Sequence, residues 1–241
     1  MLMPTDPEVL KFVQDTLDFY PADAVDWPLE KNREFYATYC TAFRQPRPEG
    51  IEAWDDHVVV PESHAVPVRH YERKGERARG VTVLYAHGGG FVLGDLDSHD
   101  DVCAEICANT GLPVVAVDYR LAPEHVFPAA VEDGLAAYRA LLDEGHAPGE
   151  IVLGGDSAGG GLTLAVLLKA REEGLPMPAA ACLISPWVDL KCNSGAYESR
   201  AEADPMIDQS GIAEMAALYL GGASAGDPLA SPLHADLTGL P

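Results

Sequence analysis

The stretch IVLGGDSAGGG, residues 151–161, places one serine among glycines where an apolar run gives way to a helical pattern. A short, almost continuously apolar run is typical of a strand buried on both faces, and AGGGLTLAVLLKAREEG after it is typical of a helix. Similar apolar runs occur at residues 81–86, 112–119 and 179–185, with helical patterns between the first three strands. Strands that alternate with helices predict an α/β fold with a mostly parallel central sheet and helices on both faces.

The flanking regions differ from this pattern. Residues 1–48 are amphipathic and helical in character, and two short alternating runs after them predict an antiparallel hairpin. Residues 190–222 are irregular and follow the carboxyl end of a strand, which is the functional edge of an open α/β sheet. We therefore predict an N-terminal helical cap at 1–48, a core at 49–189, a cap insertion at 190–222 and a return to the core at 223–241. An ordinary surface excursion is the alternative for residues 190–222.

Composition narrows the class of protein. The 241 residues can bury one sizeable core, and 38 acidic against 16 basic residues give a formal charge of −22. This charge argues against a nucleic-acid partner, and it fits either a high-salt habitat or a well-solvated surface.

The five cysteines form no CxxC pair, so neither a disulfide framework nor a metal site is predicted. No secretory signal pattern and no apolar run of about 18 residues is present, which predicts a cytoplasmic protein with no membrane span.

The segment Gly155-Asp156-Ser157-Ala158-Gly159 fits the pattern G-x-S-x-G. It lies between a predicted strand and a predicted helix, where a sharp turn exposes the serine hydroxyl and flanking glycines avoid steric clashes. The helix N-terminus also favours developing negative charge. Ser157 is therefore the candidate nucleophile.

A second glycine-rich segment, His87-Gly88-Gly89-Gly90-Phe91, follows the strand predicted at 81–86. Consecutive glycines let main-chain N–H groups turn into a cavity, as an oxyanion hole requires. A phosphate-binding loop is the rival interpretation, but the G-K-[ST] ending is missing. Together the two motifs predict acyl transfer, with the N–H groups of Gly88, Gly89 and Ala158 as oxyanion donors.

These motifs resemble those of the hormone-sensitive-lipase family of α/β-hydrolases, whose oxyanion motif is HGGG and whose nucleophile motif is GDSAGG. The resemblance extends to DYRLAPEH at residues 118–125 and to SPW at 185–187. It implies the α/β-hydrolase fold, a helical cap over the pocket, and a serine carboxylesterase that acts on short to medium acyl esters. It also implies that no metal or organic cofactor takes part.

Other residues receive supporting roles. We expect Asp156 to brace the serine turn through backbone hydrogen bonds, and His87 to act as a scaffold for the glycine loop. Gly90, Gly155 and Gly159 provide close backbone approach. Phe91 and Trp187 are candidates for the pocket lining, although core packing explains large aromatics equally well. Arg120 and Glu124 are expected to form a structural ion pair.

The chain order of an α/β-hydrolase triad is serine, acid, histidine, and only His234 follows Ser157. Asp227 lies seven residues before it, too close for the strand–helix crossover that separates acid and base in this fold. We therefore predict that His234 is a surface residue and that the acid and histidine lie beyond Pro241. The chain would then end before the acid-bearing strand, and its open sheet edge would favour a homodimer.

Two other functions remain open at this stage. The absence of a base would suit a catalytically inactive module that binds small molecules on the same fold. Amide hydrolysis would use the same serine and oxyanion donors and would differ only in the leaving group.

Overall fold

The computed structural model describes residues 6–19, 21, 24, 27–60, 63–75, 80–201, 204 and 206–241. Its strands form one sheet in the order β1-β2-β4-β3-β5-β6. The first two strands and their neighbour β4 pair antiparallel, and β4, β3, β5 and β6 run parallel. The strand bounds are β1 (Ile51–Val59), β2 (Ala65–Arg73), β3 (Thr82–Ala86), β4 (Val114–Val117), β5 (Ile151–Asp156) and β6 (Ala180–Ile184). The predicted hairpin and parallel sheet are confirmed.

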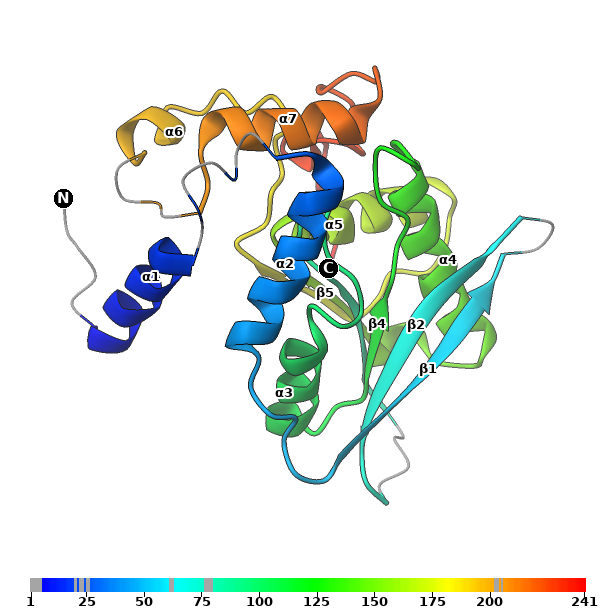
Figure 1. Ribbon diagram of the computed structural model, residues 1–241. Helices are drawn as coiled ribbons and strands as arrows, with labels where there is room; N and C mark the ends of the chain where they lie inside the picture. Colours follow the sequence, from blue (N-terminus) through cyan, green and yellow to red (C-terminus); the bar gives the residue numbers. More distant parts are fainter. Residues whose placement is uncertain are drawn as a thin grey trace.

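Helices cover both faces of this sheet, as expected (Figure 1). The face built on Val83 and Tyr85 packs against α3 (Asp100–Thr110) through Cys103 and Cys107. The opposite face includes Leu84 and packs against α4 (Ala129–Asp143) and α5 (Ser157–Glu172). Side chains alternate between the faces along each strand, so an almost fully apolar strand supplies two cores.

The remaining helices lie outside this three-layer core. They are α1 (Pro7–Phe19), α2 (Leu29–Phe43), α6 (Ala196–Ser199) and α7 (Gln209–Leu220). The rings of Phe12 and Phe43 join α1 to α2 at a centroid distance of 5.9 Å. Figure 1 shows α6 and α7 together at one end of the molecule, near the start of α2. Residues from both predicted cap regions are thus close in space.

Strand β6 forms one edge of the sheet in the described part of the chain, because it pairs only with β5. Ile184 on this strand is 49% exposed. The expected homodimer stays a prediction. All five cysteines are free, as the sequence suggested. Among the described residues, no helix has the length and apolar character needed to cross a bilayer.

Candidate active site

Ser157 lies where strand β5 turns into helix α5. It is the first residue of α5, and its φ of +50° is a left-handed conformation that a residue with a side chain rarely adopts. The turn is possible because Gly159 has no side chain: a Cβ there would lie 2.0 Å from the carbonyl oxygen of Ala86. The helix can therefore start directly against the end of β3, which leaves Ser157 partly exposed. This is the sharp strand-to-helix turn that G-x-S-x-G predicted.

The glycine loop, residues 87–93, follows strand β3 and lies against this turn. Gly88 is so close that a Cβ on it would be 3.3 Å from Ser157 Cβ and 2.2 Å from Asp156 Oδ2. Its N–H donates a hydrogen bond to Asp156 Oδ1 at 3.0 Å. The Gly88 N–H is thus engaged inside the protein in this structure, and its role as an oxyanion donor stays a prediction.

Other main-chain donors beside the serine lack such a partner. Among the described residues, none accepts a hydrogen bond from the N–H of Gly89 or Gly90. Ala158 is the second residue of α5, where a helix provides no intrahelical acceptor for the N–H. These three N–H groups remain available around the serine, and the helix N-terminus adds a favourable dipole.

Asp156 is the centre of a small hydrogen-bond network. Its Oδ1 accepts from Tyr85 Oη at 3.0 Å as well as from Gly88, and His99 Nε2 lies 3.4 Å away. Burial raises the pKa of the Asp156 carboxyl, but hydrogen bonds from His99 and Tyr85 outweigh this effect and hold the pKa below its usual range. Asp156 thus accepts a backbone hydrogen bond, as the sequence suggested. This bond holds the glycine loop, whereas the expected bond was one within the serine turn.

The sequence did not single out Tyr85 or His99. Tyr85 belongs to an apolar strand, and His99 lies eleven residues after Gly88 in a turn before α3. His99 Nε2 is 3.2 Å from the Gly88 nitrogen. No local pattern marks such contacts, because the chain returns to the loop only in the folded protein.

His87 has the scaffold role that its position suggested. Its Nδ1 donates to the Gly88 carbonyl at 2.7 Å, and its own carbonyl accepts from Tyr119 Oη at 2.7 Å. The imidazole stacks on the Tyr119 ring at a centroid distance of 4.2 Å. Burial lowers the pKa of His87 to about 4, so the ring is neutral at physiological pH.

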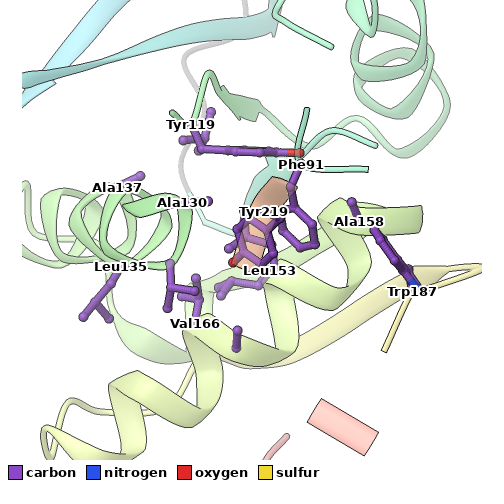
Figure 2. Packing of buried hydrophobic residues seen from close by; sticks show 14 of the residues in the cluster. Phe91, Tyr119, Ala130, Leu135, Ala137, Leu153, Ala158, Val166, Trp187 and Tyr219 are labelled. Atoms are coloured by element: carbon purple, nitrogen blue, oxygen red, sulfur yellow. The ribbon is translucent and has the colours of Figure 1, made fainter. Parts of the chain in front are cut away.

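Phe91 and Trp187 lie in the hydrophobic core and not in a pocket lining (Figure 2). The Phe91 ring stacks on Tyr219 of α7 at a centroid distance of 3.8 Å, and Trp187 lies 6.0 Å from it. Phe91 is 3% exposed. Packing, the alternative role for these two aromatics, accounts for their positions: Phe91 fastens the glycine loop to α7.

A cavity of about 260 Å³ lies beside the glycine loop instead. Helix α2 contributes Leu29, Asn32 and Phe35 to its wall, and the loop contributes Val92 and Leu93. The rest of the lining comes from Ala24, Trp27, Met206, Asp208, Gly211, Glu214, Met215 and Leu218. A larger open recess of about 870 Å³ between α6 and the start of α7 contacts none of the predicted site residues.

The ion pair predicted between Arg120 and Glu124 does not form. Arg120 Nε donates to both oxygens of Asp133 at 3.0 and 2.9 Å, and its backbone N–H donates to Asp133 Oδ2 at 2.8 Å. Glu124 pairs with Arg33 of α2 at 2.7 Å. The two residues of the DYRLAPEH segment therefore hold it to different helices, which spacing within the segment could not reveal.

No hydrogen bond joins any of the eight histidines to Ser157 in the described residues. His234 Nε2 bonds instead to Asp189 Oδ1 at 3.1 Å, and its side chain is 32% exposed. Asp227 accepts from the Leu229 N–H in a local turn. His234 and Asp227 are thus not a pair, as the crossover argument predicted. The acid and base expected after Pro241 stay a prediction.

The described residues also contain no cluster of three or more histidine, cysteine, aspartate or glutamate side chains that could hold a metal ion.

Comparisons with known proteins agree with this fold. A family model for the alpha/beta hydrolase fold matches residues 83–241. An acetyl-hydrolase of Streptomyces hygroscopicus is 45% identical over 185 residues, which cover 76% of this chain and 62% of that protein. An ethyl acetate hydrolase of Pseudomonas putida is 41% identical over 57% of this chain and 46% of its own length. The chain thus spans between about half and three fifths of the length of these curated relatives.

Solved structures show the same likeness in three dimensions. The crystal structure of EstE5 soaked with ethyl alcohol is 43% identical, with a TM-score of 0.89 over 98% of this chain and 77% of that one. An esterase from the bacterial hormone-sensitive lipase family is 38% identical, also with a TM-score of 0.89, over 99% and 77% of the two chains. This chain belongs to the α/β-hydrolase family, in its hormone-sensitive-lipase group.

Proposed function

We propose that this protein is a serine carboxylesterase in which Ser157 forms an acyl-enzyme. The observation that carries the proposal is the left-handed serine at the start of α5, beside a glycine loop with unpaired N–H groups. Such a residue stays in a strained conformation only where the surrounding structure imposes it. The relatives named for acetyl and ethyl acetate hydrolysis support the same reaction.

In this mechanism Ser157 Oγ attacks the ester carbonyl carbon, and its proton passes to a general base. The tetrahedral oxyanion accepts hydrogen bonds from the N–H groups of Gly89 and Ala158, with Gly88 or Gly90 as a third donor. The carbon–oxygen bond to the alcohol then breaks and leaves the acyl group on Ser157. Water hydrolyses this acyl-enzyme and releases the carboxylic acid.

We propose short acyl esters as substrates. The cavity of about 260 Å³ beside the glycine loop lies just below the usual range of roughly 300–1,000 Å³ for small-molecule sites. Its wall is largely apolar, which suits an alkyl group. We assign residues 1–48 and 190–222 to a cap, because helices from both contribute to that wall. We also propose that the protein is located in the cytoplasm.

The test is release of p-nitrophenol from p-nitrophenyl acetate and butyrate by the full-length gene product, with Ser157→Ala as control. We expect Ser157→Ala to lower kcat by at least about 10³-fold. A fluorophosphonate should label the wild type and not the variant. Absence of both hydrolysis and labelling would overturn the proposal and favour the inactive binding module.

One observation favours that second function: no described histidine is hydrogen-bonded to Ser157. Rates of hydrolysis of an anilide and an ester of the same acyl group distinguish amide hydrolysis from ester hydrolysis. Faster cleavage of the anilide would reassign the reaction.

A further inference from the structure

Arg33 of α2 connects the cap region to two loops of the active site. Its Nε donates to the Val92 carbonyl at 2.8 Å, in the glycine loop. One Nη2 bond goes to the Ala122 carbonyl at 2.7 Å, and Glu124 receives two bonds at 2.7 and 2.9 Å. One guanidinium group therefore holds four acceptor atoms on three residues, from two chain segments that lie far from α2 in sequence.

These acceptors are themselves tied together beside the nucleophile. The Ala122 N–H donates to the Phe91 carbonyl at 2.9 Å, so the segment around Ala122 is bonded to the glycine loop. Val92 is 1% exposed and Ala122 is fully buried. An exposed ion pair is worth little by itself, but a planar fork with four bonds fixes direction as well as distance. Arg33 thus sets where α2 sits relative to the loop.

Residues of α2 on either side of Arg33 in sequence form one wall of the 260 Å³ cavity. Asn32 and Phe35 lie one and two residues from Arg33 in sequence and line that wall, and Val92 and Leu93 of the glycine loop also line the cavity. Met215 of α7 closes over the loop, since its Sδ lies 2.5 Å from the position that a Cβ on Gly90 would take. A group in the cavity would therefore contact both the helix that carries Arg33 and the loop that Arg33 holds.

We propose that Arg33 is a positioning residue that couples occupation of this cavity to the oxyanion donors. The inference rests on the proposed esterase function. An alkyl group of the substrate that fills the cavity settles α2 against the loop, and Arg33 carries that placement to the backbone of Val92, two residues after Gly90. Binding energy from a non-reacting part of the substrate then appears in kcat and not only in KM.

If Arg33 only holds these segments together, its substitution should have a different effect. Arg120 and Asp133 form a purely structural clamp away from the cavity, and loss of a clamp lowers stability for every substrate alike. The dependence of kcat on acyl length distinguishes the two roles.

The experiment measures kcat and KM of the full-length protein for p-nitrophenyl acetate, propionate, butyrate and hexanoate. In the wild type we expect kcat to rise from acetate to butyrate. Arg33→Lys keeps the charge but cannot reach all four acceptors, so we expect kcat for butyrate to fall about tenfold and kcat for acetate about twofold. KM should still decrease with acyl length in the variant, because the apolar wall remains.

Two further variants sharpen the result. Glu124→Gln leaves the bonds from Arg33 to Val92 and Ala122 in place, so it should retain most of the rise in kcat. Arg139→Lys alters an exposed pair with Glu173 far from the cavity and should leave all values unchanged. Thermal melting checks that each variant is folded.

An equal loss of kcat for all four esters in Arg33→Lys, or an unchanged rise with acyl length, overturns the coupling. If Arg33→Lys does not fold, Arg33→Gln takes its place, and an equal loss of kcat for all four esters in that variant, or an unchanged rise with acyl length, has the same meaning. Failure of the wild type to hydrolyse any ester or react with the fluorophosphonate is a different result. It removes the proposed function and this inference with it.

Discussion

The Gly88 N–H donates to Asp156 Oδ1 at 3.0 Å, which joins the first glycine of the HGGG motif to the residue immediately before the nucleophile. The bond places the glycine loop against the serine turn from the backbone side. It also engages the Gly88 N–H, whereas the N–H groups of Gly89 and Gly90, farther along the loop, have no acceptor among the described residues. We therefore expect Asp156 to affect catalysis through the position of the glycine loop.

This relationship predicts different results for two variants of Asp156. Asp156→Ala removes the acceptor, so kcat/KM for p-nitrophenyl acetate should fall about 100-fold through misplaced donors. Asp156→Asn keeps an oxygen that can accept from Gly88 and should lose less than about tenfold. Equal losses in steady-state kinetics would show that the charge matters and not the acceptor.

Gly159 offers a test of the serine turn. Gly159→Ala places a Cβ 2.0 Å from the Ala86 carbonyl oxygen, so α5 must move away from β3. We expect a loss of stability of about 2 kcal/mol or more, together with loss of Ser157 labelling. The matched control is Gly149→Ala, where a Cβ meets nothing within 4 Å. Urea unfolding of both variants gives the comparison, and equal midpoints would contradict the packing argument.

Asp118, at the end of β4, predicts a pH dependence of stability. Burial raises the pKa of Asp118 to about 6, and Asp95 adds to the effect. Between the unfolded value of 3.8 and about 6, the folded protein binds more protons than the unfolded chain, so this group favours folding at low pH and opposes it above pH 6. Asp118→Asn should therefore raise stability at pH 7.5 by about 1–3 kcal/mol.

The gain from Asp118→Asn should shrink at pH 5. Melting temperatures of wild type and variant at the two pH values check this, and an equal difference at both would contradict the cause. Added salt should reduce the gain, because part of it comes from repulsion by other carboxylates.

Asp133 predicts a large effect on folding. It is completely buried and accepts bonds from Arg120 and from His64 Nε2 at 2.6 Å. Asp133→Ala leaves the Arg120 charge without its buried partner and should cost about 3–5 kcal/mol. The neighbouring Glu132→Ala removes an exposed partner of Arg120 and should cost less than about 1 kcal/mol. Denaturant unfolding measures both, and similar losses would contradict the role of burial.

The sequence by itself determined the sheet, the serine turn and the rejection of His234 as the base. These follow from local causes: apolar runs predict buried strands, G-x-S-x-G between a strand and a helix predicts the turn, and the six residues between Asp227 and His234 cannot hold a crossover. Each of these inferences needs only neighbouring residues and the geometry of the chain.

Only the tertiary structure decided which groups meet across the fold. It shows ion pairs between Arg33 and Glu124 and between Arg120 and Asp133. It also shows the hydrogen bond from Gly88 to Asp156 and the stacking of Phe91 on Tyr219. A hydrogen bond or a ring contact requires two segments to come within a few ångströms, and sequence spacing carries no information on partners that are 59 or 91 residues apart, as Arg33 is from Val92 and Glu124. Packing of the helices against the sheet brings those segments together.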